Sequence, residues 1–194
     1  MNSPTLIPII PQDAIYVVHV EGDAPHFATA FAQTWHRLPR AVQGRLLDFW
    51  HGTGKLRFPI ITLTRERVCQ LKPEPYVIVG SMLMDGFLFT FCSSYTDNLP
   101  LSPLGVLIAH ELAHADNRVS GRTLRCTPPH QTEDAVDRTI RRWGFHPDEL
   151  AAACDAVTSR LPRIKLPAVE QLYAEIHAAR LCLALVHAAT VMDP

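Results

Sequence analysis

The spacing of apolar residues along this chain predicts short strands, mostly in its first half, and helices from one end to the other. β-branched and aromatic residues gather in short segments bounded by turn-forming residues, as strands do. The predicted strands cover residues 14–20, 59–64, 75–79 and 86–92. Elsewhere apolar residues recur every three or four positions, which is the period of a helix that buries one side. The predicted helices cover residues 25–36, 40–51, 102–117, 132–143, 147–159 and 167–189.

The order of these elements predicts an α+β fold, because mixed strands come first and helices make up the C-terminal half. Local signals mark the helix ends. Ser102 is a candidate N-cap with Pro103 at the first helical position, and Gly144 is a natural residue to end the helix before it. Residues 93–100 and 118–130 are predicted to be loops.

Composition narrows the class of protein. The 194 residues are 47% hydrophobic and 19% charged, which favours one globular domain spanning residues 1–194. Basic residues number 18 and acidic residues 19, so we expect no nucleic-acid partner for the chain as a whole. The 5 cysteines form no CxxC pair, which indicates free thiols in a reducing, cytoplasmic setting. No segment reaches the roughly 18 apolar residues of a membrane span, so we expect no membrane partner.

The motif that carries chemistry is HELAH at residues 110–114, an HExxH sequence on a predicted helix. His110 and His114 are four residues apart, so they project from one side of the helix and can bind one Zn²⁺ through two imidazole nitrogens. Glu111 projects from a different side of the helix than the two histidines. From there it can act as general base on a metal-bound water molecule without being a ligand itself. The other side carries an apolar stripe of Leu104, Ile108 and Leu112.

A catalytic zinc site usually has three protein ligands and a water molecule, so a third ligand is expected outside the motif. Asn117 and Ser120 stand where HExxHxxGxxH would need Gly and His. The third ligand is therefore expected from the acidic cluster on the next predicted helix, and Glu133 is our candidate. Asp134, Asp137 and His130 remain alternatives.

Asp137 shares a helix face with Glu133, because the two are four residues apart. We predict that Asp137 orients a ligand imidazole, most directly that of His110. The residue that stabilises a developing oxyanion is left open among His130, Tyr95 and Arg138.

HELAH, followed by Glu133-x-Ala135-x-Asp137 and then by Trp143-Gly144-Phe145, resembles the gluzincin-type zinc metallopeptidases, including their M48-type and ImmA/IrrE-like bacterial branches. In that family ExxxD follows HExxH one helix later. The resemblance covers about residues 107–145, and it departs from the M48 pattern at Val136, where Ala is more common. It implies a zincin-like fold with a small mixed sheet and an active-site helix, zinc as cofactor, and a peptide or protein substrate.

In zincin-like folds an edge strand precedes the active-site helix and pairs with the extended substrate, and we place residues 86–92 there. The sequence thus predicts a zinc-dependent metallopeptidase. One alternative is a catalytically silent zinc-binding sensor or regulatory domain, against which Glu111 argues. Another is a nucleic-acid binder that uses Arg138, Arg141 and Arg142, although such residues are more often a solvated helix face. The apolar residues of the last predicted helix form core or the surface of a homodimer.

Overall fold

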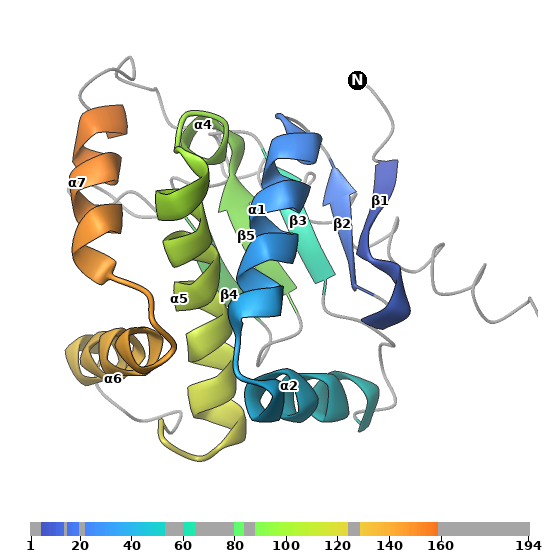
Figure 1. The fold of residues 1–194 in the computed structure, drawn as a ribbon, viewed down its shortest axis with the longest axis vertical. Coiled ribbons are helices and arrows are strands. Elements are labelled where there is room, and N and C mark those ends of the chain that lie inside the picture. Colours follow the sequence, from blue (N-terminus) through green and yellow to red (C-terminus); the bar gives the residue numbers. More distant parts are fainter. Residues whose placement is uncertain are drawn as a thin grey trace, which may run out of the picture.

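The computed structural model describes residues 5–13, 15–19, 22–52, 60–64, 80–83, 88–123 and 129–158. Helices predominate in this part of the chain and stand beside a mixed sheet, so the α+β organisation expected from the sequence is found (Figure 1). From residue 93 onward every described element is a helix. The strand predicted over residues 75–79 and the helix predicted over 167–189 lie outside the described residues.

Within the described residues the sheet has five strands, in the order β1-β2-β3-β5-β4. The strands are β1 (Thr5–Ile10), β2 (Ile15–His19), β3 (Ile60–Thr64), β4 (Gly80–Leu83) and β5 (Leu88–Cys92). The central strands β2, β3 and β5 run parallel, whereas β1 and β4 pair antiparallel at the two edges. The predicted strand over residues 86–92 was placed at an edge, and this is wrong: β5 lies between β3 and β4, and among the described strands β4 is at that edge.

Both edge strands were missed in the sequence. The apolar stretch over residues 6–10 was not predicted to be a strand because it contains Pro8, which has no backbone N–H to donate to a sheet. Of the strands that the structure describes, β1 pairs with β2 alone, so at Pro8 a missing donor is tolerated, and the register shifts between Pro8 and Ile10. Strand β4 is only 4 residues long and carries too short a pattern to stand out.

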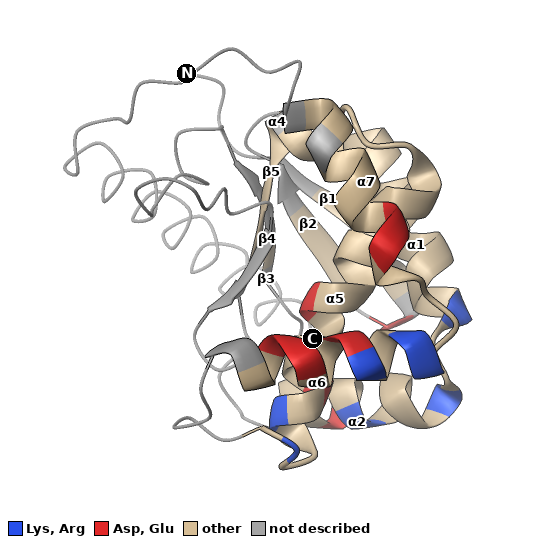
Figure 2. Ribbon diagram, turned by 90° about the vertical axis from the view of Figure 1, so that its left-hand side faces the viewer, with Lys and Arg blue, Asp and Glu red and all other residues tan. Residues whose placement is uncertain are grey.

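The described helices are α1 (Ala24–Arg37), α2 (Arg40–Gly52), α4 (Ser93–Thr96), α5 (Leu101–Val119), α6 (Pro129–Arg142) and α7 (Pro147–Thr158), and a short 3-10 helix covers Pro11–Asp13. All but α4 and the 3-10 turn match predicted helices to within a few residues. Helix α4 is a single turn in a segment predicted to be a loop. Helices α1, α5 and α7 lie on one face of the sheet (Figure 2).

The core lies between that face of the sheet and helices α1 and α5. Aromatic side chains of α1 and α2 stack in series and reach the sheet; they are Phe27, Phe31, Trp35 and Trp50, with Phe89 and Phe91 from β5. The apolar stripe of α5 is fully buried against them, at Leu104, Ile108 and Leu112. This burial fixes which side of α5 faces inward, and so which side carries His110 and His114.

The start of α5 differs from the prediction. The helix begins at Leu101 with Pro100 as its N-cap, and no side chain caps it. Pro103 is the third helical residue, which is tolerated because the first-turn N–H groups have no partner within the helix. The hydroxyl of Ser102 donates instead to Glu149 of α7, at 3.1 Å.

Helices α5 and α6 both end in a glycine with positive φ. Gly121 has φ +69° and Gly144 has φ +84°. After α6, the Phe145 N–H bonds to the Ile140 carbonyl and the Gly144 N–H to the Arg141 carbonyl, which is the Schellman pattern. The ending predicted at Gly144 is confirmed.

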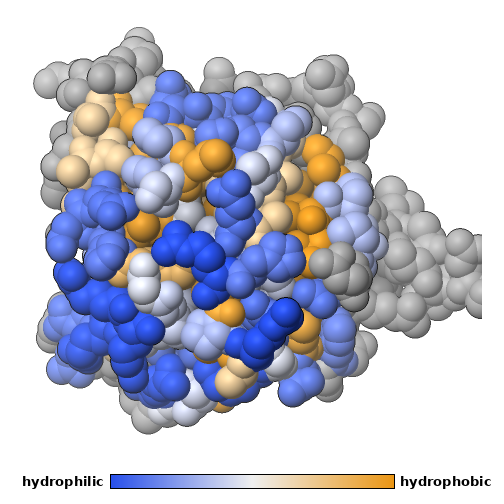
Figure 3. All heavy atoms as spheres, viewed as in Figure 1, coloured by the Kyte–Doolittle hydropathy of each residue, from blue (hydrophilic) through white to orange (hydrophobic). Residues whose placement is uncertain are grey.

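The outer face of the helices is largely hydrophilic, most densely over the end where α6 and α2 lie (Figure 3). Along α6 the charges are segregated, with carboxylates between residues 133 and 137 and arginines between residues 138 and 142, as the helix dipole favours (Figure 2). Among the helices of the described residues, none has the length and apolar content to cross a membrane.

Candidate metal centre

The candidate centre forms where α6 packs across α5. Val136 and Ile140 of α6 are fully buried against α5. Residues on α6 at the same helical phase as Val136 therefore also face α5, and Glu133 is one turn before it. This crossing brings Glu133 to His110 and His114.

The side chains of His110, His114 and Glu133 converge. The Nε2 atoms of the two histidines are 3.2 Å apart. One Glu133 oxygen lies 3.1 Å from His110 Nε2 and the other lies 3.6 Å from His114 Nε2. Among the described residues these three form a group whose ligand atoms all lie within 4.8 Å of one another.

These separations fit a small tetrahedral ion. Zinc bonds nitrogen and oxygen ligands at about 2.0–2.1 Å, so two ligands of a tetrahedral zinc lie about 3.3 Å apart. The observed donor separations of 3.2, 3.1 and 3.6 Å bracket that value. Two imidazole nitrogens and one carboxylate are also a donor set typical of catalytic zinc. The Glu133 side chain is 54% exposed, so the group is open to water on one side.

Each of Glu133 and His110 shifts the pKa of the other in the direction that favours its charged form. Hydrogen bonds with His110 and His114 hold the pKa of the Glu133 carboxyl far below its ordinary value. Burial lowers the pKa of His110, but the hydrogen bond to Glu133 and the negative charges of Glu111, Glu133 and Asp137 outweigh it, so that pKa is raised. The protein thus concentrates negative charge where a cation would bind.

Glu111 is buried beside the group, with 4% of the residue exposed. Burial raises the pKa of Glu111 above its ordinary value; His110 and His114 pull the pKa down, and the charge of Glu133 pushes it up. A carboxylate in this setting can accept a proton more readily than an exposed one.

Asp137 faces the opposite nitrogen of His110. Its Oδ1 lies 3.9 Å from His110 Nδ1, while His110 Nε2 points to Glu133. This distance is too long for a hydrogen bond, so in this structure Asp137 acts on His110 through charge. The arrangement is nevertheless the one in which a carboxylate selects the histidine nitrogen left free for a metal.

The other candidate residues lie differently. Asp134 is exposed on α6 and does not belong to the converging group. The side chain of His130 lies outside what the structure describes. Of the oxyanion candidates, Tyr95 is buried in α4, which leaves it little surface for a substrate, and Arg138 is exposed on α6.

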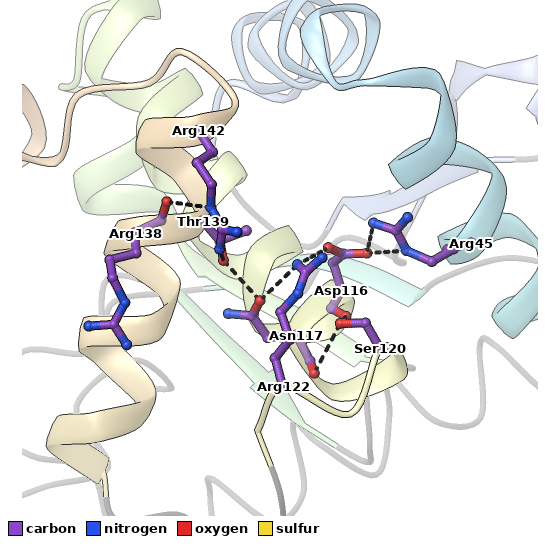
Figure 4. Close-up of polar contacts among 8 residues, drawn as sticks. All are labelled: Arg45, Asp116, Asn117, Ser120, Arg122, Arg138, Thr139 and Arg142. Carbon is purple, nitrogen blue, oxygen red and sulfur yellow. Dashed lines mark hydrogen bonds and ion pairs between the residues drawn. The ribbon is translucent and has the colours of Figure 1, made fainter.

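Asp116 and Asn117, two and three residues after the motif, were not predicted to belong to the site, and both are fully buried. Asp116 pairs with Arg45 of α2 and with Arg122, at 2.7 and 3.0 Å (Figure 4). Asn117 lies three residues after His114 and so shares its face of α5, which is a signal that helical periodicity could have supplied. Arg45 is 71 residues from Asp116, and no local pattern predicts that pair.

Comparisons of the chain with protein-family models, with curated proteins and with solved structures find no match. What the chain does must therefore be argued from the site.

Proposed function

We propose that this protein is a zinc-dependent metallopeptidase of the gluzincin type, built on a zincin-like α+β domain. One observation carries the proposal: the donor atoms of His110, His114 and Glu133 converge at spacings suited to zinc, beside the buried carboxylate of Glu111. The HExxH and ExxxD motifs supply exactly these side chains, but neither motif by itself requires that two helices bring them together.

His110, His114 and Glu133 would hold the zinc ion, which supplies a Lewis acid that acidifies water and polarises a carbonyl group. Glu111 takes a proton from the attacking water as the water oxygen bonds to the carbonyl carbon of the peptide. The same carboxylic acid then gives that proton to the amide nitrogen as the C–N bond breaks. The negative charge of Asp137 beside His110 Nδ1 favours a proton on that nitrogen, which leaves Nε2 free.

The sheet offers a strand to which an extended peptide substrate could bind. Among the described strands β4 lies at the edge of the sheet, pairs antiparallel with β5, and packs against the motif helix α5. An extended peptide can add to such an edge through backbone hydrogen bonds, and its scissile bond then lies beside the motif. The substrate strand that the resemblance implies is therefore β4, rather than the segment over residues 86–92.

The zinc site is tested first. We expect about one zinc per wild-type chain by mass spectrometry, and a large loss of zinc in Glu133→Ala. Asp134→Ala is the matched control, because it removes the adjacent carboxylate from the same helix and should keep its zinc. Full zinc in Glu133→Ala would exclude Glu133 as the ligand, and no zinc in wild type after reconstitution would exclude the metalloenzyme.

Activity is tested on a random-sequence peptide mixture with zinc-loaded protein. Glu111→Gln should keep its zinc and lose cleavage by roughly 10²- to 10⁴-fold, because it removes the general base and not a ligand. Zinc binding without cleavage in wild type would favour the catalytically silent zinc-binding domain, which does not need a base at this position.

A further inference from the structure

The third ligand depends on how two helices cross. His110 and His114 belong to α5, and their mutual position is fixed by the helix itself. Glu133 belongs to α6, and more than half of its side chain is exposed. Its distance to the histidines is therefore set by the placement of α6 on α5, and something must fix that placement.

A buried hydrogen bond joins the two helices beyond the candidate ligands. The Thr139 hydroxyl of α6 donates to Asn117 Oδ1 of α5, at 2.9 Å, and both residues are buried (Figure 4). Asn117 follows His110 by seven residues and His114 by three, so all three side chains lie along one line of α5. Helix α6 is thus held at two points of that line, by Glu133 at the histidines and by Thr139 one turn further on.

An arginine bonds to each partner of this hydrogen bond. Arg142 of α6 donates to Thr139 Oγ1 at 3.2 Å, and Arg122 donates to Asn117 Oδ1 at 3.4 Å. Arg122 is brought there by the end of α5, because its backbone N–H bonds to the Asn117 carbonyl. The acceptor of the buried bond is therefore shared by a hydroxyl and a guanidinium.

The chain of contacts continues to α2 through Asp116. Arg122 pairs with one oxygen of Asp116 at 3.0 Å, and Arg45 of α2 bonds the other at 2.9 Å (Figure 4). The Ser120 hydroxyl donates to the Asp116 carbonyl at 2.6 Å. The last turn of α5 is thereby tied to α2, so Asn117 presents a fixed acceptor to Thr139.

Asn117 is also incompletely satisfied. Its Nδ2 is buried and has no hydrogen-bond partner among the described residues. A buried donor of this kind weakens folding, so stability by itself does not explain an amide at this position. A requirement for the Oδ1 acceptor toward α6 does explain it.

We infer that Thr139 and Asn117 are positioning residues, which set the crossing of α6 on α5 and hold Glu133 at the distance from His110 and His114 that a metal needs. This inference rests on the proposed zinc site. Neither residue touches the metal or the substrate, and both act through Glu133.

The test compares zinc affinity, measured by competition with a chromophoric chelator, across full-length variants. Thr139→Val keeps the shape of the side chain and removes the hydroxyl, and it should weaken zinc binding about 10-fold, as loss of an outer partner does. Thr139→Ser keeps the hydroxyl and should bind zinc as wild type does. The visible spectrum of the cobalt(II) form should change in Thr139→Val and return in Thr139→Ser, because it reports coordination geometry.

The matched control is Thr34→Val. Thr34 is also a buried threonine whose hydroxyl crosses between helices, from α1 to the Gly105 carbonyl of α5, at 3.4 Å. Its removal should leave zinc affinity unchanged. A second control is Thr139→Val in the Glu133→Ala background, where no further loss of affinity is expected because the residue through which Thr139 acts is gone.

The outcomes separate the two proposals. A wild-type protein that binds no zinc overturns the proposed function and this inference together. Zinc binding by wild type with an unchanged affinity in Thr139→Val, or the same loss in Thr34→Val, overturns only the positioning role. If Thr139→Val does not fold, Asn117→Ala takes its place, because it removes the acceptor of the same bond together with the unpartnered Nδ2, and unchanged zinc affinity in that variant overturns the inference equally.

Discussion

Glu111 and Asp116 are carboxylates of the same helix, five residues apart, and both are buried. Asp116 is matched by two guanidinium groups, Arg45 and Arg122, and its oxygens are fully engaged. For Glu111, burial and the charge of Glu133 raise the pKa, although His110 and His114 lower it. At the residue scale, a carboxylate neutralised by arginines can serve structure, whereas one left with a raised pKa is free to exchange a proton.

Removing the charge of Asp116 should therefore affect folding. We expect Asp116→Asn to lower the free energy of unfolding by about 3 kcal/mol, because two arginines lose their buried partner, although their own exposure to water limits the loss. Urea unfolding monitored by circular dichroism measures this. Asp148→Asn, which removes an exposed pair with Arg141, should change stability by less than about 1 kcal/mol. Equal effects of the two substitutions would contradict the argument.

At the scale of single elements, helix ends decide where functional side chains lie. Gly121 ends α5 and turns Arg122 back toward Asn117, and Gly144 ends α6 and directs the buried Phe145 into the core. In each case a positive φ permits the turn, which side chains with a Cβ adopt only at a cost. The crossing of α6 on α5 is bounded by these two turns.

Alanine at two glycines should have opposite effects. A Cβ would meet nothing within 4 Å at Gly144 or at Gly44, so only the backbone matters. Gly144→Ala should lower the free energy of unfolding by about 1–2 kcal/mol, because φ is +84°. Gly44→Ala, inside α2, should raise it by about 0.5–1 kcal/mol. Thermal and urea unfolding give both values, and the same sign for both would refute the assignment of the Gly144 turn.

At the scale of the whole molecule, the candidate metal links helices that the chain connects only through a long segment. The two histidines come from α5, and the Glu133 carboxylate comes from α6, which follows α5 after residues 120–128. A ligand that binds only the folded arrangement stabilises it by mass action. The metal site and the packing of α6 on α5 should therefore support each other.

Metal removal should consequently lower the melting temperature. Free zinc at about 100 times its dissociation constant contributes about 2.7 kcal/mol, which for a chain of this size corresponds to roughly 5–10 °C. Differential scanning calorimetry with zinc and with a chelator measures the shift. Glu133→Ala should show much less of it, and magnesium should not replace zinc because imidazole ligands suit it poorly. An equal zinc shift in Glu133→Ala would mean that the ion binds elsewhere.

Features that depend on residues close together in the chain could be predicted from the sequence, and features that depend on residues far apart could not. Helices α1, α2, α5, α6 and α7 and strands β2, β3 and β5 were predicted, because each depends on a local apolar period or on turn residues. The HExxH histidines and Glu111 were singled out for the same reason, since four-residue spacing fixes their common helix. Their roles as ligands and base, and that of Glu133, stay predictions.

By itself the sequence determined helices α1, α2, α5, α6 and α7, the end of α6 at Gly144 and the motif, because side chains close in the chain meet through the geometry of one helix. Only the tertiary structure decided that β4 rather than β5 forms the edge of the sheet. It also decided that Arg45 meets Asp116 and that Thr139 meets Asn117, pairs 71 and 22 residues apart. Strand order and helix crossing are set by the packing of the whole core, and no short segment carries that information.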